Sequence, residues 1–202
     1  MNDDAFIRLA SPDDAVEILD IYRPFIEETA VTFEEEVPSP EEFEERIKRI
    51  RADAPYLVCQ VNGRIVGYAY AAPYRTRASY RWNREVSVYI HPEYHRRNIA
   101  RALYSALFEI LKMQHITNLL AVITMPNEAS VKLHESFGFR HCGLFNRVGY
   151  KLHQWHQVGW WELSFLEDEQ QVPEIPLLFS SFEKLYPANT ILEKASAIIK
   201  IS

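Results

Sequence analysis

Three strand-like segments follow one another between residues 56 and 90, and they restrict the fold more than any other feature of the chain. The first two, 56–61 and 64–71, are separated by Asn62-Gly63, the favoured two-residue turn of a β-hairpin. The third, 85–90, alternates in polarity, so its successive side chains should point to opposite faces of a sheet. A hairpin followed by a third strand predicts a sheet built partly from strands that are consecutive in the chain.

Helical patterns lie on both sides of these strands. Ser11 and Ser39 are each followed by proline and acidic residues, a pattern typical of a helix N-terminus. Pro24 should end or kink the first of these helices, because proline lacks the amide hydrogen that the helix needs. Apolar residues at helical spacing predict another helix over 99–110, and a shorter one is expected over 126–136.

Further strands are expected at 6–9 and 119–125, and in two runs that end near Phe165. The complete order is then β-α-α-β-β-β-α-β-α-β-β, in which strands are sometimes adjacent and sometimes separated by helices. This order predicts an α/β fold with a mixed sheet flanked by helices. One such domain should cover residues 1–165.

Residues 166–202 differ in composition from the rest of the chain. The polar run 167–171, followed by Pro173 and Pro176, predicts a linker. Apolar residues at helical spacing over 191–199 predict an amphipathic helix after it. This C-terminal extension could pack on its own domain or on a partner subunit.

The 202 residues are 48% apolar and carry a formal net charge of −6. One sizeable core is therefore expected, and an extended basic face for nucleic acid is not, although a local basic pocket for a small anion remains compatible. The acidic residues Asp3 and Asp4 argue against a signal peptide, and no run reaches the roughly 18 apolar residues of a membrane helix. We expect a cytoplasmic protein in which Cys59 and Cys142, both in apolar runs, are buried free thiols.

A basic loop precedes the helix predicted over 99–110. Its residues 95–101, with Arg96 and Arg97, lead directly into the helix N-terminus, where unpaired N–H groups and the helix dipole favour an anion. A pyrophosphate has the size expected of such a guest. The alternative is a solvated basic turn at the start of a helix.

The short helix over 126–136 contains a second candidate residue. Asn127 is suited to cap this helix, while Leu133 and Phe137 are spaced to pack on the core. His134 lies off that apolar stripe, so it could face a cleft. Its alternative is a partly exposed histidine without a chemical role.

Together these segments resemble the GNAT superfamily of N-acetyltransferases. The family's pyrophosphate motif, Gln/Arg-x-x-Gly-x-Gly/Ala, corresponds to residues 95–100, in which Ala100 conforms while His95 and Asn98 depart. Asparagine is the next-best residue to glycine for a left-handed backbone, so the loop is expected to keep its shape. The chain is most similar to the phosphinothricin and methionine sulfoximine acetyltransferase branch. That resemblance extends over about 7–165 and includes the blocks 32–33, 56–58, 67–71, 77–80, 133–135, 149–151 and 155–159.

The resemblance implies an α/β fold with a mostly antiparallel sheet, and acetyl-CoA as the acyl donor. It implies that Glu85 is the general base and that His134 lies near the thioester, where an imidazole can serve in acid–base transfer. The alternative for Glu85 is a surface carboxylate paired with Arg84 or Arg81. The donor would lie along residues from one strand, the basic loop and the short helix: Val88, Tyr89, Ile90, His95, Arg96, Arg97, Asn98, Ile99, Ala100, Arg101, Asn127 and Ser130.

For the acceptor, the resemblance implies a small amino-acid-like amine. Arg77 is the best candidate for gripping its carboxylate or phosphinate, because a guanidinium binds such groups in bidentate fashion. Phe33, Tyr74 and Tyr80 are expected near it. No metal is expected, although His153 and His156 have helical ligand spacing. Family members often form dimers, so a homodimer is expected.

Two alternatives remain open at this point. The chain could be a GNAT enzyme that acts on a different amine, although the arginines near the acceptor side disfavour a polycation. It could also be a non-catalytic acyl-CoA-binding module that regulates a partner. The presence of both Glu85 and His134 argues against that second alternative.

Overall fold

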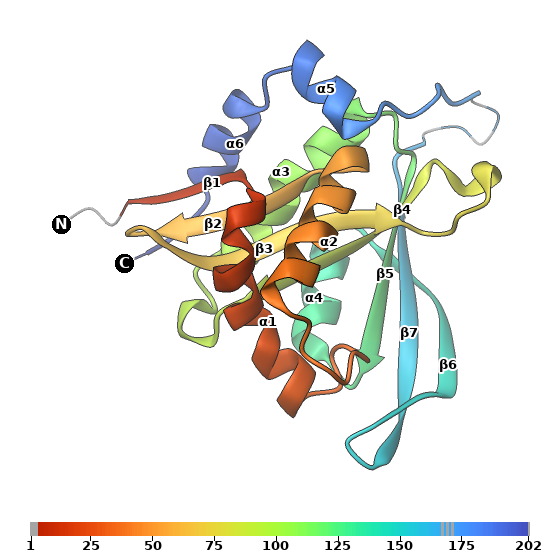
Figure 1. The fold of residues 1–202 in the computed structure, drawn as a ribbon. Helices are drawn as coiled ribbons and strands as arrows, with labels where there is room; N and C mark the ends of the chain where they lie inside the picture. Colours follow the sequence, from red (N-terminus) through yellow and green to blue (C-terminus); the bar gives the residue numbers. More distant parts are fainter. Residues whose placement is uncertain (1–3, 167, 169, 171, 202) are drawn as a thin grey trace.

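The computed structural model describes residues 4–166, 168, 170 and 172–201. A seven-stranded sheet with the order β1-β2-β3-β4-β5-β7-β6 forms its centre (Figure 1). All neighbouring strands are antiparallel except β4 and β5, which are parallel. The predicted mixed α/β fold is therefore confirmed. The strands are β1 (Ala5–Leu9), β2 (Tyr56–Val61), β3 (Arg64–Pro73), β4 (Asn83–Ile90), β5 (Asn118–Met125), β6 (Arg140–Lys151) and β7 (Gln154–Ser164).

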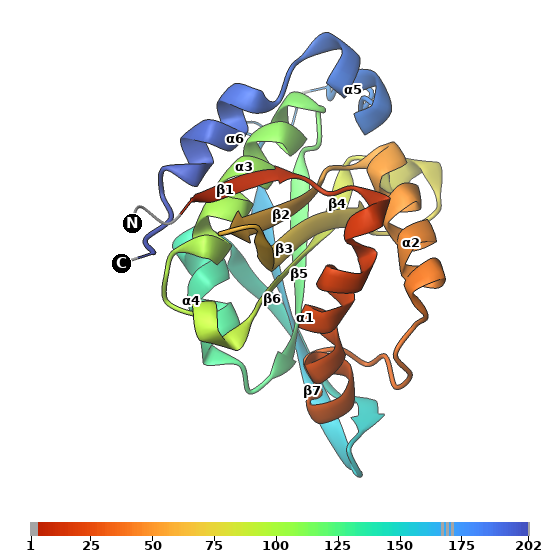
Figure 2. The same ribbon diagram turned by 60° about the vertical axis from the view of Figure 1, so that its left-hand side comes forward.

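Helices cover both faces of this sheet (Figures 1 and 2). Two apolar clusters fill the two interfaces, one centred on α1 and α2 and the other on α3. Successive side chains of β4 point to opposite faces of the sheet, so this strand contributes to both clusters. Val86 packs in the α3 cluster, and Tyr89 packs against the α1 cluster. The helices are α1 (Ala15–Glu28), α2 (Pro40–Asp53), α3 (Ile99–Met113), α4 (Glu128–Ser136), α5 (Phe179–Leu185) and α6 (Asn189–Ser196).

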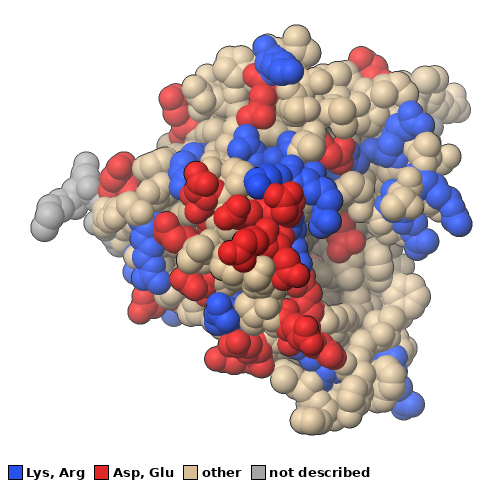
Figure 3. All heavy atoms as spheres, in the orientation of Figure 1, with Lys and Arg blue, Asp and Glu red and all other residues tan. Residues whose placement is uncertain are grey.

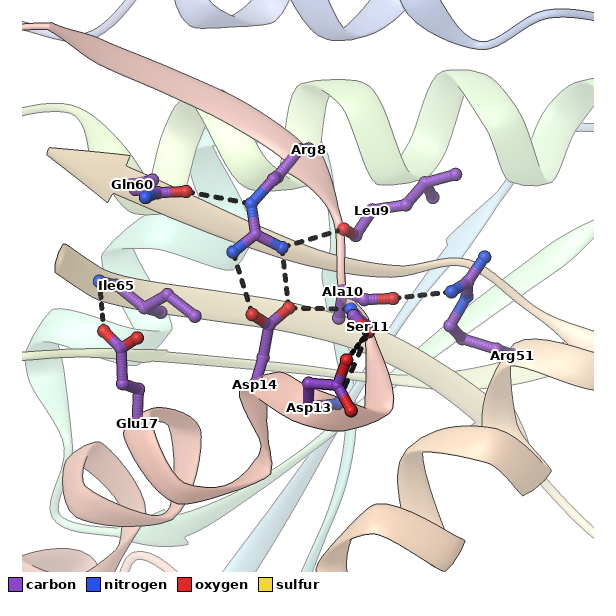
Figure 4. A network of polar contacts seen from close by, with 10 residues as sticks. All are labelled: Arg8, Leu9, Ala10, Ser11, Asp13, Asp14, Glu17, Arg51, Gln60 and Ile65. Atoms are coloured by element: carbon purple, nitrogen blue, oxygen red, sulfur yellow. Dashed lines mark hydrogen bonds and ion pairs between the residues drawn. The ribbon is translucent and has the colours of Figure 1, made fainter. Parts of the chain in front are cut away.

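A polar network fixes β1 to the start of α1 (Figure 4). The guanidinium of Arg8 donates to both carboxylate oxygens of Asp14, at 2.6 and 2.9 Å. Ser11 and Asp14 form the predicted capping arrangement around a 3-10 turn, Pro12–Asp14, which leads into α1. The Glu17 carboxylate accepts the backbone N–H of Ile65 at 2.9 Å. These contacts orient α1 across the sheet.

Pro24 was predicted to end or kink the first helix, and it does not end it. Helix α1 continues through it to Glu28. An internal proline costs about 3 kcal/mol or more, yet burying one large aliphatic side chain contributes roughly 1.5–3 kcal/mol. Ile18 and Tyr22 before Pro24 and Ile26 after it are buried. The burial of these side chains offsets the backbone hydrogen bond that proline cannot donate.

The sheet opens between β4 and β5. Their parallel pairing consists of three positions and ends at Glu85 opposite Leu120. Beyond that point β4 remains paired with β3 on its other side, through Ile90 opposite Gly67. The side of residues 86–90 that faces β5 is therefore not occupied by a neighbouring strand.

The C-terminal extension packs on its own chain. Helix α6 contacts α3 and β1, and Ser196 accepts the backbone N–H of Ile7 at 2.8 Å. Helix α5, which the sequence pattern did not predict, inserts Phe179 and Phe182 into the α3 cluster. Of the predicted linker, residues 167, 169 and 171 lie outside the described residues, as do residues 1–3 at the N-terminus.

Cys59 is buried as predicted, but Cys142 is exposed. The reason is the position of β6 at the edge of the sheet, where its register shifts between His141 and Gly143. The apolar run around Cys142 therefore covers no core. Within the described residues, none of the helices combines the length and the apolar character needed to cross a membrane.

Candidate active site

The loop before α3 adopts a backbone suited to an anion. Arg96 and Asn98 both have φ near +61°, the left-handed conformation expected for Asn98. Helix α3 begins directly afterwards at Ile99, so its first N–H groups have no partner within the helix. The Arg97 carbonyl accepts the N–H of Lys200, which connects the extension to this loop. The loop therefore presents free donors and positive charge at one helix end.

A groove of about 590 Å³ runs from this loop along β4. Eleven of the twelve residues predicted to bind the donor line it, including Val88, Ile90, Asn127 and Ser130. Arg97 is the exception, and its guanidinium lies over the ring of Tyr94 at 4.9 Å from the ring centroid. The groove thus combines a cationic end with an apolar strand-lined channel.

His134 lies at the opening between β4 and β5. It is 3% exposed and lines a narrow cavity of about 60 Å³ together with Ser87 and Tyr104. Its Nδ1 donates to the Ser130 carbonyl at 2.8 Å, which leaves Nε2 as an acceptor for the Tyr104 hydroxyl at 3.1 Å. Burial lowers the pKa of His134, although the hydrogen bond to Ser130 acts in the opposite direction. Burial therefore favours the neutral imidazole, and its two hydrogen bonds orient the ring.

Glu85 lines a third cavity, of about 470 Å³, on the other side of the opening. Burial raises the pKa of its carboxyl. No described residue forms an ion pair with it, and Arg84 pairs with Asp53 at 3.0 Å instead. The proposed pairing of Glu85 with Arg84 or Arg81 is therefore wrong. A carboxylate that is desolvated and not neutralised is suited to accept a proton.

The residues predicted to bind the acceptor do not all line the same cavity. Phe33 lines the Glu85 cavity together with Trp160. Tyr74 lies against Trp160 at a centroid distance of 6.0 Å, and Tyr80 lies against Tyr74 at 5.6 Å. Arg77 lines a separate, larger cavity and not the Glu85 cavity.

The narrow cavity connects the other two. It shares Val88, Asn127 and Ser130 with the donor groove, and Ser87 and Val122 with the Glu85 cavity. A molecule in the groove could therefore extend through the opening of the sheet toward Glu85. This arrangement suits direct transfer of a group between two bound molecules.

Several residues of this site were not singled out by sequence reasoning. Tyr104 belongs to the apolar stripe of α3, so nothing in the pattern distinguishes it from a core residue. Glu34 and Tyr70 also line the Glu85 cavity. The Glu34 carboxylate accepts hydrogen bonds from both terminal nitrogens of Arg46, at 2.7 and 3.1 Å. Neither His153 nor His156 is part of a group of three or more potential metal ligands among the described residues.

Comparisons with known proteins agree with this geometry. The family described as "Acetyltransferase (GNAT) domain" matches residues 7–160. A phosphinothricin N-acetyltransferase of Streptomyces viridochromogenes is 35% identical over 79% of this chain and 87% of its own length. An L-methionine sulfoximine/L-methionine sulfone acetyltransferase of Salmonella typhimurium is 29% identical over 83% and 98%. The crystal structure of a GNAT superfamily phosphinothricin acetyltransferase from Sinorhizobium meliloti, in complex with AcCoA, has a TM-score of 0.80 at 31% identity, covering 84% of this chain and 93% of that one.

Proposed function

The chain belongs to the GNAT family of acetyltransferases, and we propose that it transfers the acetyl group of acetyl-CoA to the amino group of a small amino-acid-like substrate. Phosphinothricin and methionine sulfoximine define the type of acceptor. This proposal depends on one observation. The donor groove and the Glu85 cavity are connected through the opening of the sheet. The names of the two relatives support the choice of acceptor.

The donor groove fits acetyl-CoA by its chemistry. The left-handed loop and the start of α3 offer N–H groups, with Arg96 and Arg101, for a pyrophosphate. The open side of residues 86–90 offers backbone groups that a pantetheine arm could pair with, as an added strand does. When bound, acetyl-CoA supplies an activated thioester. Asn127 and Ser130 would border it.

Glu85 would act as the general base. An α-amino group has a pKa of roughly 7.7–8.0, so it must lose a proton before it can attack a carbonyl carbon. A carboxyl whose pKa burial raises takes up that proton more readily than an exposed one does. Phe33, close to this carboxyl in the same cavity, would position the acceptor, with Tyr74 and Tyr80 behind Trp160.

His134 would perform the second proton transfer. The acceptor position of its neutral ring is Nε2, to which the Tyr104 hydroxyl donates a hydrogen bond. Nε2 would take up the second N–H proton that the amine loses, as the Tyr104 hydroxyl turns aside, and release it to the departing sulfur. The nitrogen then ends as an amide, the sulfur as a thiol and the ring neutral. Tyr104 fixes the tautomer and orientation of the ring before this transfer and does not contact the reacting atoms itself.

A thiol-release assay tests the proposal. Purified protein is mixed with acetyl-CoA and a panel of L-amino acids, phosphinothricin, methionine sulfoximine and a polyamine. We expect release of CoA thiol with phosphinothricin, methionine sulfoximine or a related L-amino acid, and its loss in Glu85→Gln. Release with the polyamine alone would favour a GNAT enzyme for a different amine. Binding of acetyl-CoA without release for any acceptor would favour a non-catalytic acyl-CoA-binding module.

We also propose a homodimer. The β6–β7 hairpin exposes a group of large apolar side chains, and such patches mark protein interfaces. The exposed residues of this hairpin are Leu144, Phe145, Val148, Tyr150, Leu152 and Trp155. Sedimentation velocity of the wild type and of Trp155→Asp tests the proposal. A wild-type chain that sediments as a monomer at all concentrations would contradict it.

A further inference from the structure

A cavity larger than both the donor groove and the Glu85 cavity does not contain Glu85. It has a volume of about 940 Å³ and lies between α2, the loop after β3 and the C-terminal extension. Six arginines and two acidic residues, Glu34 and Asp53, line it. Figure 3 shows basic side chains gathered over α2 and over the loop that follows β3. The arginines are Arg46, Arg49, Arg75, Arg77, Arg81 and Arg84.

The two carboxylates of this cavity each have one arginine partner. Glu34 pairs with Arg46 at 2.7 Å, and Asp53 pairs with Arg84 at 3.0 Å. The other four arginines form no ion pair with any described residue. The cavity therefore has a surplus of four positive charges in a chain whose formal net charge is −6.

Arg84 adds a second, independent observation. It is 4% exposed, and its Nε is buried with no hydrogen-bond partner among the described residues. Its terminal nitrogens are used, by Asp53 and by the carbonyls of Arg81 and Asn83. Arg84 is therefore a buried positive charge in the cavity wall, with Asp53 as its acidic partner.

The C-terminal extension supplies one wall of the cavity. Ile175, Pro176 and Leu178 line it, and they lie outside the family-matched residues 7–160. The extension is held in place by specific contacts, because Trp82 donates to the Glu174 carbonyl at 2.7 Å. Leu177 and Gln114 also exchange hydrogen bonds, at 2.7 and 3.0 Å. The wall is therefore fixed to the domain.

We propose that this cavity, the arginine pocket, is a second ligand site that binds a small organic polyanion with two or more separated carboxylate or phosphate groups. Guanidinium groups on opposite walls match such a ligand, since each can bind one oxyanion in bidentate fashion. Glu34 and Tyr70 line both this pocket and the Glu85 cavity, so the two sites share a wall. The proposal does not depend on acetyl transfer.

Isothermal titration calorimetry of the full chain tests the proposal. Citrate serves as the tricarboxylate probe and fructose 1,6-bisphosphate as the bisphosphate probe, so the stronger binder identifies the oxyanion. We expect saturable one-to-one binding of at least one probe. In Arg49→Ala/Arg81→Ala, binding should weaken at least about tenfold, the order expected for losing a charged hydrogen bond.

Two single variants locate the site. Arg140→Ala removes one positive charge from an exposed position of β6 and should leave binding unchanged. Arg96→Ala should also leave it unchanged, because Arg96 lies in the donor groove. The proposal is overturned if neither probe binds saturably, or if Arg96→Ala abolishes binding while Arg49→Ala/Arg81→Ala does not.

A matched pair of variants tests the wall that the extension supplies. Ile175→Asp places a competing carboxylate in the pocket, whereas Ile175→Asn has nearly the same size without the charge. We expect weaker probe binding for Ile175→Asp than for Ile175→Asn. Equal affinities for the two variants would contradict a site that includes the extension.

Discussion

The Tyr104 hydroxyl lies 3.1 Å from Nε2 of His134, and both side chains are buried where the sheet opens. Because Nδ1 of His134 donates to the Ser130 carbonyl, the hydroxyl must be the donor to Nε2. Burial also raises the pKa of Tyr104 well above its ordinary value, so the hydroxyl keeps its proton. The pair therefore fixes one tautomer and one orientation of the imidazole.

Tyr104→Phe should retain the ring packing and remove this hydrogen bond. The hydroxyl stabilises the neutral imidazole, so its loss should raise the pKa of His134 toward the ordinary value. We expect kcat to fall about tenfold, since one hydrogen bond contributes roughly 0.5–1.5 kcal/mol. The KM for acetyl-CoA should hardly change. Steady-state kinetics and an NMR titration of the imidazole measure both effects, and an unchanged titration would contradict a positioning role.

The environment of Glu85 predicts how activity depends on pH. Burial raises its pKa above the ordinary 4.5, so the carboxylate form is lost at a higher pH as the solution is acidified. The acid limb of kcat/KM should therefore lie above the pH expected for an exposed glutamate. Glu85→Gln should abolish this limb and lower kcat about 10²- to 10⁴-fold, the usual contribution of a general base.

Stability provides the control for that variant. A carboxyl whose pKa is raised on folding stabilises the native state below its unfolded pKa, and this contribution is lost as pH rises through the folded pKa. At neutral pH the buried negative charge of Glu85 is then unfavourable. Glu85→Gln should be at least as stable as the wild type there, as measured by urea denaturation. A large loss of stability would mean that reduced activity reflects unfolding.

The order of strands and helices could be predicted because its signals are local. The Asn62-Gly63 turn and the Ser39 cap each depend on a few neighbouring residues, and the structure contains both. The continuation of α1 through Pro24 could not be predicted in this way. It depends on tertiary burial of Ile26, which no local signal contains.

The candidate site was predictable only in part, for the same reason. Strand alternation places Glu85 and Tyr89 on one face, but it does not show that β4 and β5 separate after Glu85. Helical spacing places Tyr104 on the buried stripe of α3 without showing that His134, 30 residues later, faces its hydroxyl. Spacing also cannot decide between two adjacent cavities. Arg77 was predicted to bind the carboxylate or phosphinate of the acceptor, and it lines the arginine pocket, which shares a wall with the Glu85 cavity.

Asn98 allows a test of the donor loop. Its φ of 61° is left-handed, a conformation that costs most L-residues roughly 1–2 kcal/mol, whereas glycine adopts it freely. Asn98→Gly should therefore keep the affinity for acetyl-CoA, and Asn98→Val should lower it about tenfold. Calorimetric titration with acetyl-CoA compares the two. Equal affinities for both variants would contradict a loop whose shape is needed for the donor.

Gly149 of β6 tests the role of Phe33. A Cβ at Gly149 would overlap the Phe33 ring, with Cε1 at 2.6 Å, whereas a Cβ at Gly143 on the same strand would meet nothing within 4 Å. Phe33 is 39% exposed, so the ring can move aside at little cost in stability. Gly149→Ala should therefore raise KM for the acceptor severalfold, with little change in KM for acetyl-CoA. Gly143→Ala should match the wild type in both. If Gly149→Ala leaves the acceptor KM unchanged, Phe33 does not position the acceptor.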